Sequence, residues 1–343
     1  MIKKILALTV AVLMLFLVGC KKDEIDLMSS EPDDVSSEVV PVNKNKVNPL
    51  TGIQDLDPSL FDRRPAAIMI NNTSVAQPVQ TGVGKADIVY ETEVEGGVTR
   101  LLAVFKNIEA ASQLGTVRSA RYPYVDIALG HDAVYLHHGQ DPTYCAPHLN
   151  DIDHITIDTN NVTGKRISNG LATEHTLYAF GDKVWAEISK KFRTTTQKTS
   201  TWQKFAGEDE QLSFADGVAN TINVPFQYSA SFTYDATTGR YNRSTRGGAR
   251  LDYVTKEQMS FKNVFILKTS IVNYPDGKHR KVYLDGGDGY YCVNGTYKPI
   301  RWTKGAASNG ISMTETDGTP LTVNQGNSWV FIINSATTVP SFN

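Results

Sequence analysis

The chain has 343 residues, of which 34 are Lys or Arg and 36 are Asp or Glu, so its formal net charge at pH 7 is −2. No stripe of basic residues stands out, which argues against nucleic acid as a partner. Three cysteines are too few for a disulfide-rich secreted scaffold. These limits leave a globular protein whose location and ligands must be read from local patterns.

The N-terminus has the parts of an export signal. Lys3 and Lys4 give a short positive region, and an uncharged apolar run extends from residue 5 to residue 18. That run is shorter than the roughly 20 apolar residues that span a bilayer, and it has the length of a signal-peptide core. It ends in Leu17-Val18-Gly19-Cys20, the form of a bacterial lipobox.

We therefore expect residues 1–19 to be a lipoprotein signal peptide and Cys20 to be lipidated. Two or three acyl chains on this cysteine would anchor the protein in the lipid bilayer, on the extracytoplasmic face of the cell membrane. An ordinary secretory signal with a chance cysteine, or a short anchor helix, remains an alternative. Loss of Lys3 and Lys4 would leave 32 basic and 36 acidic residues, a net charge of −4.

Residues 20–49 differ in composition from the rest. After the cysteine they are rich in Asp, Glu, Ser, Val and Pro and contain no aromatic residue. Such a segment buries too little apolar surface to offset the entropy lost on ordering. We expect a disordered acidic tether that ends near residue 50.

The remaining residues are numerous enough for two domains. In the first, residues 50–205, the pattern mixes strands with helices. Alternating or apolar segments predict strands at 66–70, 86–94, 99–105 and 133–137, and helical spacing predicts helices at 121–129 and 182–192. Gly96-Gly97 is expected to join the second and third strands into a hairpin. The strand at 86–94 has the alternation of apolar and polar residues that is typical of a half-buried strand. Ser119 and Asp182 are the expected helix N-caps.

The second predicted domain, residues 216–343, is mostly β. A polar, Gly-containing stretch precedes it, and Asp276-Gly277, Asn294-Gly295 and Asp317-Gly318 are strong turn signals. Short strands are predicted at 226–234, 241–243, 263–267, 281–284, 290–293 and 328–333. The predicted fold class is α+β, with a mixed α/β N-terminal domain around a central sheet and a β-rich C-terminal domain.

No familiar catalytic signature occurs in the sequence. The first polar cluster is Glu91, Glu93 and Glu95, which point to one face if the strand continues. They are candidate catalytic carboxylates or a face opposite a basic ligand, and the alternative is a wet strand face with Tyr90, Thr92 and Val94 turned inward.

The second cluster is basic. Arg118 and Arg121 flank Ser119 just before the first predicted helix, and Arg100 follows the glutamates. A helix N-terminus with guanidinium groups suits phosphate or carboxylate. These residues are therefore candidate ligand-binding residues, with pairing to the glutamates as an equal alternative.

The third cluster follows the strand at 133–137, where His137 and Asp141 are further candidate ligand-binding residues. We expect no metal and no cofactor, because the nearby histidines have no familiar ligand spacing and His137 and His138 would point to opposite faces. We favour Cys145 and Cys292 as two separate buried residues, although a disulfide stays open.

Six segments resemble the YerB-type lipoproteins, two-domain bacterial surface lipoproteins of unknown function. The most specific parts are VEGG with the following Thr-Arg (94–100) and VRSAR (117–121). The six segments are 48–52, 63–72, 84–105, 115–139, 240–267 and 317–333.

This resemblance implies the same two-domain plan and envelope location, and no known reaction. Two places depart from the family. Ala249-Arg250 precede Asp252 where the family more usually has a histidine before the aspartate, and Gln140-Asp141-Pro142 replaces a segment of small residues.

Two functions fit the sequence. The favoured one is a lipoprotein that binds an anionic envelope component, such as a cell-wall fragment or a polymer phosphate, near Arg100, Arg118 and Arg121, or that acts as an envelope scaffold. The alternative is a cell-wall hydrolase that uses carboxylates of the strand bearing Glu91, Glu93 and Glu95, since glycoside cleavage needs two carboxyl groups several ångströms apart. Carboxylates engaged by arginines would favour the binding function.

Overall fold

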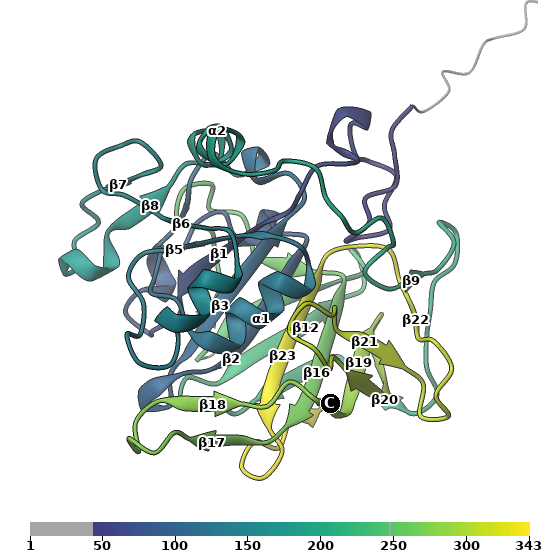
Figure 1. The fold of residues 1–343 in the computed structure, drawn as a ribbon. Coiled ribbons are helices and arrows are strands. Elements are labelled where there is room, and N and C mark those ends of the chain that lie inside the picture. The colour runs from purple at the N-terminus through teal and green to yellow at the C-terminus, as the bar shows by residue number, and fades with distance from the viewer. Residues whose placement is uncertain (1–43, 247) are drawn as a thin grey trace, which may run out of the picture. The chain divides into compact units, whose positions relative to one another are not determined.

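Eleven strands form one central sheet in the computed structural model, which describes residues 44–246 and 248–343 (Figure 1). The predicted signal peptide, Cys20 and most of the predicted tether lie outside the described residues. The strand order is β10-β20-β19-β16-β23-β2-β3-β1-β5-β6, and β21 pairs with β20. The bounds are β1 Ala66–Asn71, β2 Ile88–Glu93, β3 Thr99–Phe105, β5 Val134–His137, β6 His154–Thr156, β10 Gly217–Val218, β16 Asn263–Thr269, β19 Gly286–Val293, β20 Thr296–Thr303, β21 Ser312–Thr314 and β23 Ser328–Asn334.

The middle of this sheet joins the two halves of the chain. β23 lies between β16 and β2 and is parallel to both, so Trp329 is opposite Val264 on one side and Val89 on the other. Strands from the first and second predicted domains therefore share one sheet. Independent folding of residues 50–205 and 216–343 stays a prediction.

A second sheet of six strands has the order β14-β13-β12-β11-β24, with β15 also paired to β13. Its strands are β11 Thr221–Val224, β12 Ala230–Asp235, β13 Arg240–Thr245, β14 Gly248–Ala249, β15 Ser260–Phe261 and β24 Ser341–Phe342. Three small sheets complete the fold: β4 Leu114–Gly115 with β8 Leu177–Ala179 and β7 Gly164–Arg166, β9 Lys204–Phe205 with β22 Thr322–Val323, and β17 Ile271–Asn273 with β18 Arg280–Val282.

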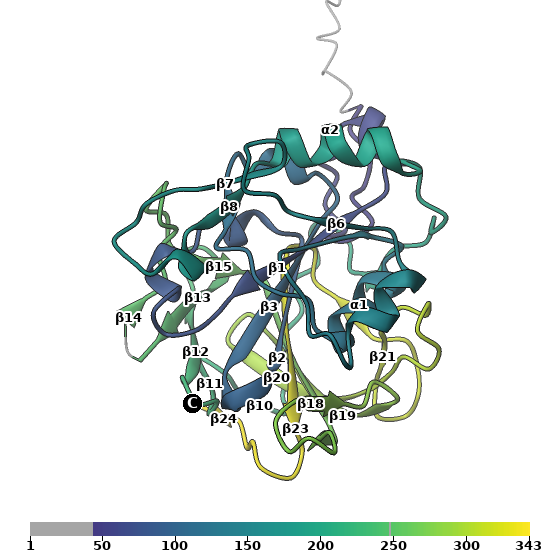
Figure 2. The ribbon, with the colours of Figure 1, turned by 60° about the vertical axis from the view of Figure 1, so that its left-hand side comes forward.

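Both faces of the central sheet are covered. Alternate side chains of β1 enter two separate cores, Ile68 and Ile70 in one, Ala67 and Met69 in the other. The first core also holds Phe232 of the six-stranded sheet and residues of helix α2 (Gly181–Lys191), and the second holds one side of helix α1 (Tyr122–Gly130) (Figure 2). The fold class is α+β, as predicted, and residues 192–246 and 248–343 contain no α-helix.

Most predicted elements are confirmed, including both helices and the β2–β3 and β12–β13 hairpins. The predicted caps are wrong. The N-cap residues are Arg121 and Phe180, neither of which makes a side-chain capping bond. α1 instead begins with Tyr122-Pro123, where proline's fixed φ suits the first turn.

Two predictions on burial are also wrong. Every residue of β2 is buried, because the strand lies between β3 and β23 and both faces of the sheet are covered. The predicted tether extends too far, since Lys46 forms a bridge with Leu56 and Asn48 is buried. β20 was not predicted at all, and Pro299 in its middle weakens the strand signal.

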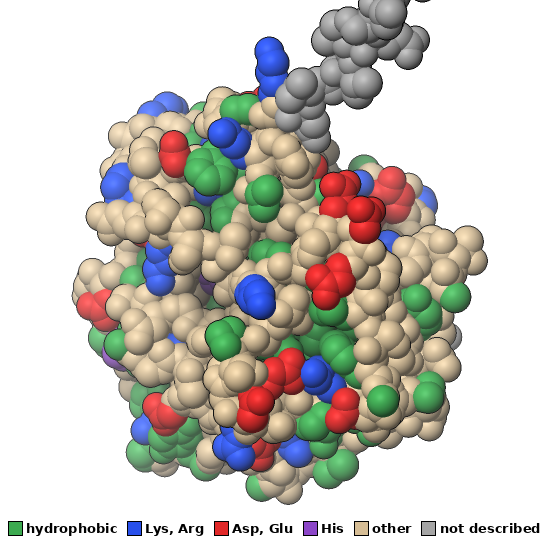
Figure 3. All heavy atoms as spheres, turned by 90° about the vertical axis from the view of Figure 1, so that its right-hand side faces the viewer, with side chains coloured by type: hydrophobic (Ala, Val, Ile, Leu, Met, Phe, Trp, Pro, Cys, Tyr) green, Lys and Arg blue, Asp and Glu red, His purple; other side chains and the backbone are tan. Residues whose placement is uncertain are grey.

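One face of the molecule, shown in Figure 3, carries both acidic and basic side chains. They are interspersed there, and the described residues form no continuous basic stripe on this face. Among the described residues, none of the helices has the length and apolar character needed to cross a membrane.

Candidate functional site

The turn after β2 brings several predicted site residues together. Glu93 ends β2, Glu95 lies in the turn, and Arg121 and Asp141 come from the segments before α1 and after β5. All four line one small site, together with Val94, Tyr122, Pro123, Tyr144, Tyr274, His279 and Arg280. The free space is about 10 Å³, close to that of one water molecule, so the side chains themselves fill most of this site.

Glu95 is held by two guanidinium groups. Arg121 Nε donates to Glu95 Oε2 at 2.7 Å, and Arg100 Nη2 donates to Glu95 Oε1 at 3.0 Å. Burial alone would raise the pKa of Glu95, but the hydrogen bond from Arg121 and the charges of both arginines outweigh it and lower the pKa to about 2. Glu95 is therefore ionised at neutral pH and has no proton to give as a general acid.

The other two candidate carboxylates are also paired. Glu91 is 1% exposed and accepts hydrogen bonds from Thr99 Oγ1 at 2.7 Å and from Arg243 Nη2 at 3.2 Å. Glu93 Oε2 lies 3.0 Å from Arg280 Nη2. The alternative of a wet strand face is wrong, because arginines from β13 and β18 cover these glutamates.

Arg118 contacts a different carboxylate from Glu95, whereas Ser119 is linked to Glu95 through Arg100. Arg118 Nη2 is 3.3 Å from Glu174 Oε1, and the carbonyl oxygen of Ser119 accepts a hydrogen bond from Arg100 Nη1. Arg100 and Arg121 thus share the single carboxylate of Glu95, and Arg118 pairs with Glu174. A role for them in ligand binding stays a prediction.

The residues after β5 are held mainly by one another. His137 Nε2 is 3.0 Å from His154 Nδ1, and burial lowers the pKa of His137 to about 4. Asp141 accepts hydrogen bonds from the backbone N–H groups of Thr143 at 3.2 Å and Tyr144 at 2.7 Å. Across residues 44–246 and 248–343, no three His, Cys, Asp or Glu side chains are grouped to hold a metal ion.

The two remaining cysteines are free and buried. Burial raises the pKa of the Cys145 thiol to about 12, so the thiolate that a nucleophile needs is not populated at neutral pH. Cys145 and Cys292 therefore act as two separate small buried residues, the arrangement that the sequence favoured.

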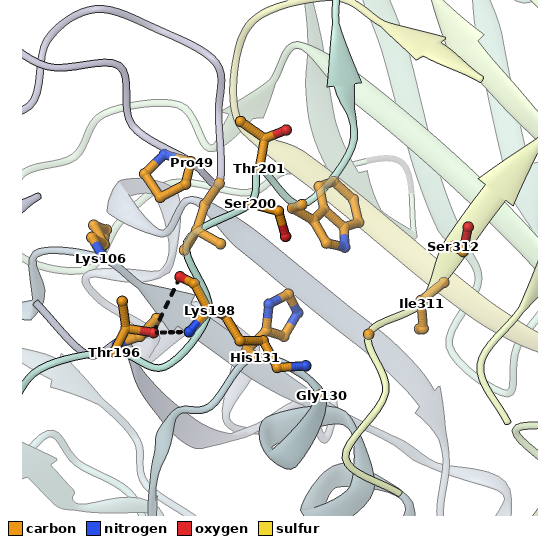
Figure 4. A pocket seen from close by; sticks show the side chains of 14 residues that line it. Pro49, Lys106, Gly130, His131, Thr196, Lys198, Ser200, Thr201, Ile311 and Ser312 are labelled. Carbon is orange, nitrogen blue, oxygen red and sulfur yellow. Dashed lines mark hydrogen bonds between the residues drawn. The ribbon is translucent and has the colours of Figure 1, made fainter. Parts of the chain in front are cut away.

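An open cavity of about 220 Å³ lies elsewhere in the fold, and we call it the lysine cavity (Figure 4). Two cations line it, Lys106 and Lys198, and no carboxylate does. The rest of the wall is apolar or neutral and consists of Pro49, Leu50, Pro65, Gly130, His131, Thr196, Ser200, Thr201, Trp202, Gly310, Ile311 and Ser312.

The charges of this cavity follow from burial. Lys106 is 2% exposed, its Nζ donates to the carbonyl oxygen of Arg63 at 2.5 Å, and burial lowers its pKa to about 8 against the opposing charges of Asp62 and Asp87. His131 Nε2 is 2.7 Å from Tyr90 Oη, and burial lowers the His131 pKa to about 3. The imidazole is therefore neutral, while the lysines supply positive charge.

Comparison with known proteins assigns most of the chain to one family. Residues 50–197 match the family described as "Protein of unknown function (DUF3048) N-terminal domain", and residues 221–330 match the corresponding C-terminal domain. The chain belongs to the DUF3048 family. This agrees with the resemblance to the YerB-type lipoproteins seen in the sequence.

One curated relative is "Putative lipoprotein YerB" of Bacillus subtilis (strain 168), which is 28% identical over 309 residues. The match covers 86% of this chain and 89% of the relative. The crystal structure of the Bacillus subtilis YerB protein is similar, with a TM-score of 0.74 and 26% identity over 87% of this chain and all of that one. These similarities support the fold and the lipoprotein class, and they name no ligand.

The lysine cavity draws on both DUF3048 segments and on the connection between them. Lys106 and His131 lie within residues 50–197, Trp202 lies in the connection, and Ile311 lies within residues 221–330. Sequence reasoning missed this cavity because no motif links these segments. Sequence reasoning also missed Arg280 as the partner of Glu93. The nearest pattern in the sequence was the predicted turn at Asp276-Gly277, which shows where the chain reverses but not what Arg280 contacts.

Proposed function

We propose that this DUF3048 protein is an extracytoplasmic lipoprotein, anchored through Cys20, that binds an anionic component of the cell envelope in the lysine cavity. The observation that carries the proposal is the composition of the cavity wall, which has two lysines and no carboxylate. Positive charge in a partly enclosed site attracts an anion more strongly than the same charge in water does.

The neutral part of the wall indicates what else the ligand contains. Leu50, Trp202 and Ile311 offer apolar surface, and Thr196, Ser200 and Ser312 offer hydroxyl groups. A site with few charges among apolar and hydroxyl groups suits an acidic group attached to a larger, partly apolar body. A fragment of an envelope polymer or lipid has this composition.

The hydrolase alternative has less support. Each of its candidate carboxylates is paired with an arginine: Glu91 with Arg243, Glu93 with Arg280, and Glu95 with Arg100 and Arg121. A general acid needs a pKa near the working pH, and the pKa of Glu95 is about 2.

Retention on purified cell wall tests the proposal, with the mature chain carrying Cys20→Ser so that it stays in solution. Lys198 is half-buried at the cavity, and its side-chain Nζ donates to the carbonyl oxygen of Ser308 at 2.7 Å. Lys198→Ala should weaken retention roughly tenfold, the loss of one charge-assisted contact. Lys190→Ala, which removes a 70% exposed lysine on α2, should leave retention unchanged.

The same assay separates this site from the one predicted by sequence. Equal retention of Lys198→Ala and the parent would refute the lysine cavity as the binding site. Loss of retention in an Arg118→Ala, Arg121→Ala double variant, with Lys198→Ala unaffected, would place the ligand at the arginines instead. Labelling with a radioactive fatty acid that disappears in Cys20→Ala tests the anchor.

A further inference from the structure

A second open cavity, of about 440 Å³, lies between the end of β13 and the segment before residue 80, and we call it the arginine cavity. It shares no lining residue with the lysine cavity. Its polar lining includes Gln77, Thr245, Arg246, Arg250, Asp252 and Lys256.

The protein beneath this cavity has more buried positive than negative charge. Arg243 and Arg250 are 2% and 8% exposed. Arg243 pairs with Glu91 at 3.2 Å, whereas Arg250 Nη2 donates to two uncharged acceptors, the Gln77 carbonyl oxygen and Gln80 Oε1. Among the described residues, Arg250 forms no salt bridge, so two buried guanidinium groups share one carboxylate.

The surroundings of Arg250 reflect this imbalance. Burial and the charge of Arg243 lower the pKa of Arg250 to about 9, and the charge of Glu91 offsets them only in part. A buried charge without a counter-charge costs free energy, and that cost is recovered if an anion binds next to it.

The one carboxylate in the lining is already engaged. Asp252 accepts hydrogen bonds from Thr81 Oγ1 at 2.8 Å and from the backbone N–H groups of Gly82 at 2.6 Å, Val254 at 2.9 Å and Thr255 at 2.9 Å. These four donors tie the carboxylate to two loops. Asp252 is one acidic group against three basic ones in the lining, so the lining keeps an excess of positive charge.

The rim adds two more cations that contact only neutral groups among the described residues. Arg246 is exposed, with its guanidinium 4.7 Å above the ring of Tyr228, and Lys256 Nζ donates to the carbonyl oxygen of Tyr253 at 2.5 Å. The Thr245 hydroxyl is buried and has no hydrogen-bond partner among the described residues. One cavity thus collects three cations and an unused hydroxyl group.

We propose that the arginine cavity is a binding site for a phosphate group. The planar fork of a guanidinium matches the oxygens of phosphate, and three cations suit a group that carries up to two negative charges. The cavity volume lies within the usual range of small-molecule sites, so it has room for a phosphate and part of its substituent. This site goes beyond the proposed function, since either cavity can bind while the other does not.

Isothermal titration calorimetry of the mature Cys20→Ser chain tests the site, with inorganic phosphate and glycerophosphodiester as separate probes. We expect binding of at least one probe, and an Arg246→Gln, Lys256→Gln double variant should weaken it at least roughly tenfold. Both side chains are exposed, so this variant should keep the fold, which circular dichroism would verify. Arg301→Gln, at an exposed arginine 3.9 Å from Asp288, should bind like the parent.

Binding of inorganic phosphate alone would assign the site to the free anion, and binding of the diester would assign it to a phosphate within a larger molecule; either supports the proposal. No heat of binding for either probe up to about 10 mM would overturn it. Unchanged affinity in the folded double variant would also overturn it. Lys198→Ala should leave phosphate affinity intact, which separates this outcome from that of the lysine cavity.

Discussion

Glu91 links three buried polar side chains. It accepts hydrogen bonds from Asn72, Thr99 and Arg243, and it is the carboxylate that balances one of two buried arginines. Its position in the middle of the fold therefore makes it a structural residue rather than a free catalytic group.

Replacing Glu91 with Gln should destabilise the protein by about 3–5 kcal/mol, because Arg243 keeps its charge in a buried place without a counter-charge. Urea unfolding of the mature Cys20→Ser chain measures this change. Glu109→Gln is the matched control, since Glu109 pairs with Arg63 but its side chain is 40% exposed, and it should cost about 0–1 kcal/mol. Equal losses of unfolding free energy in the two variants would contradict the prediction that burial makes the Glu91–Arg243 pair more important for stability than an exposed pair.

Asp87 gives the protein a pH dependence of opposite sign to that of most carboxylates. Burial raises its pKa to about 6, against hydrogen bonds from the Lys106 N–H and from Asn48. The folded state therefore holds this proton more tightly than the unfolded chain. The stabilising contribution of protonated Asp87 is complete below its ordinary pKa of 3.8 and is lost as the pH rises through about 6.

The stability difference between the parent and Asp87→Asn should reveal this contribution. We expect the parent to lose up to about 3 kcal/mol relative to Asp87→Asn between pH 4 and pH 7, two pKa units at about 1.4 kcal/mol each. Urea unfolding at a series of pH values measures the difference. A difference that is constant across that range would contradict the prediction.

At the scale of elements, the sequence predicted what is local and missed what depends on distant partners. The apolar run of β1 and the helical spacing of α2 are properties of single segments, and both elements lie where predicted. Burial of β2 was misjudged, because its neighbour β23 comes about 240 residues later in the chain, as the Thr92 contact with Ile332 shows. Alternation within one strand cannot reveal what covers its polar face.

In the candidate site, too, contacts between residues close in sequence could be anticipated, and contacts between distant residues could not. The sequence left open whether the arginines bind a ligand or pair with the glutamates, and Glu95 does pair with Arg100 and Arg121. Arg243 is 152 residues away from Glu91, and no local pattern connects them. The lysine cavity has no single motif, because its lining comes from separate segments between Pro49 and Ser312.

For the whole molecule, the shared sheet determines how the two DUF3048 segments depend on each other. All seven residues of β23 are buried, and the strand pairs with β16 on one side and with β2 on the other. A break between the segments would leave two apolar strands as open edges, which favour aggregation.

We therefore expect residues 44–205 and 216–343, expressed separately, to be insoluble or unfolded, and to regain native circular dichroism only when refolded together. Nuclear magnetic resonance spectra of the separate fragments provide the measurement. Well-dispersed spectra from each fragment alone would instead establish two independent domains, as the sequence first indicated. The undivided chain, refolded under the same conditions, is the control.

The central position of β23 in the sheet also determines how late in folding the protein can become compact. The strand lies about 240 residues after β2 in the chain, yet it is hydrogen-bonded between β2 and β16 in the sheet. Contacts between such distant segments form late, because the chain between them must first be closed into a loop. A ribosome or a secretion channel must therefore release both β2 and β23, with the chain between them, before the interior can close, and until then the chain can pass through a narrow pore.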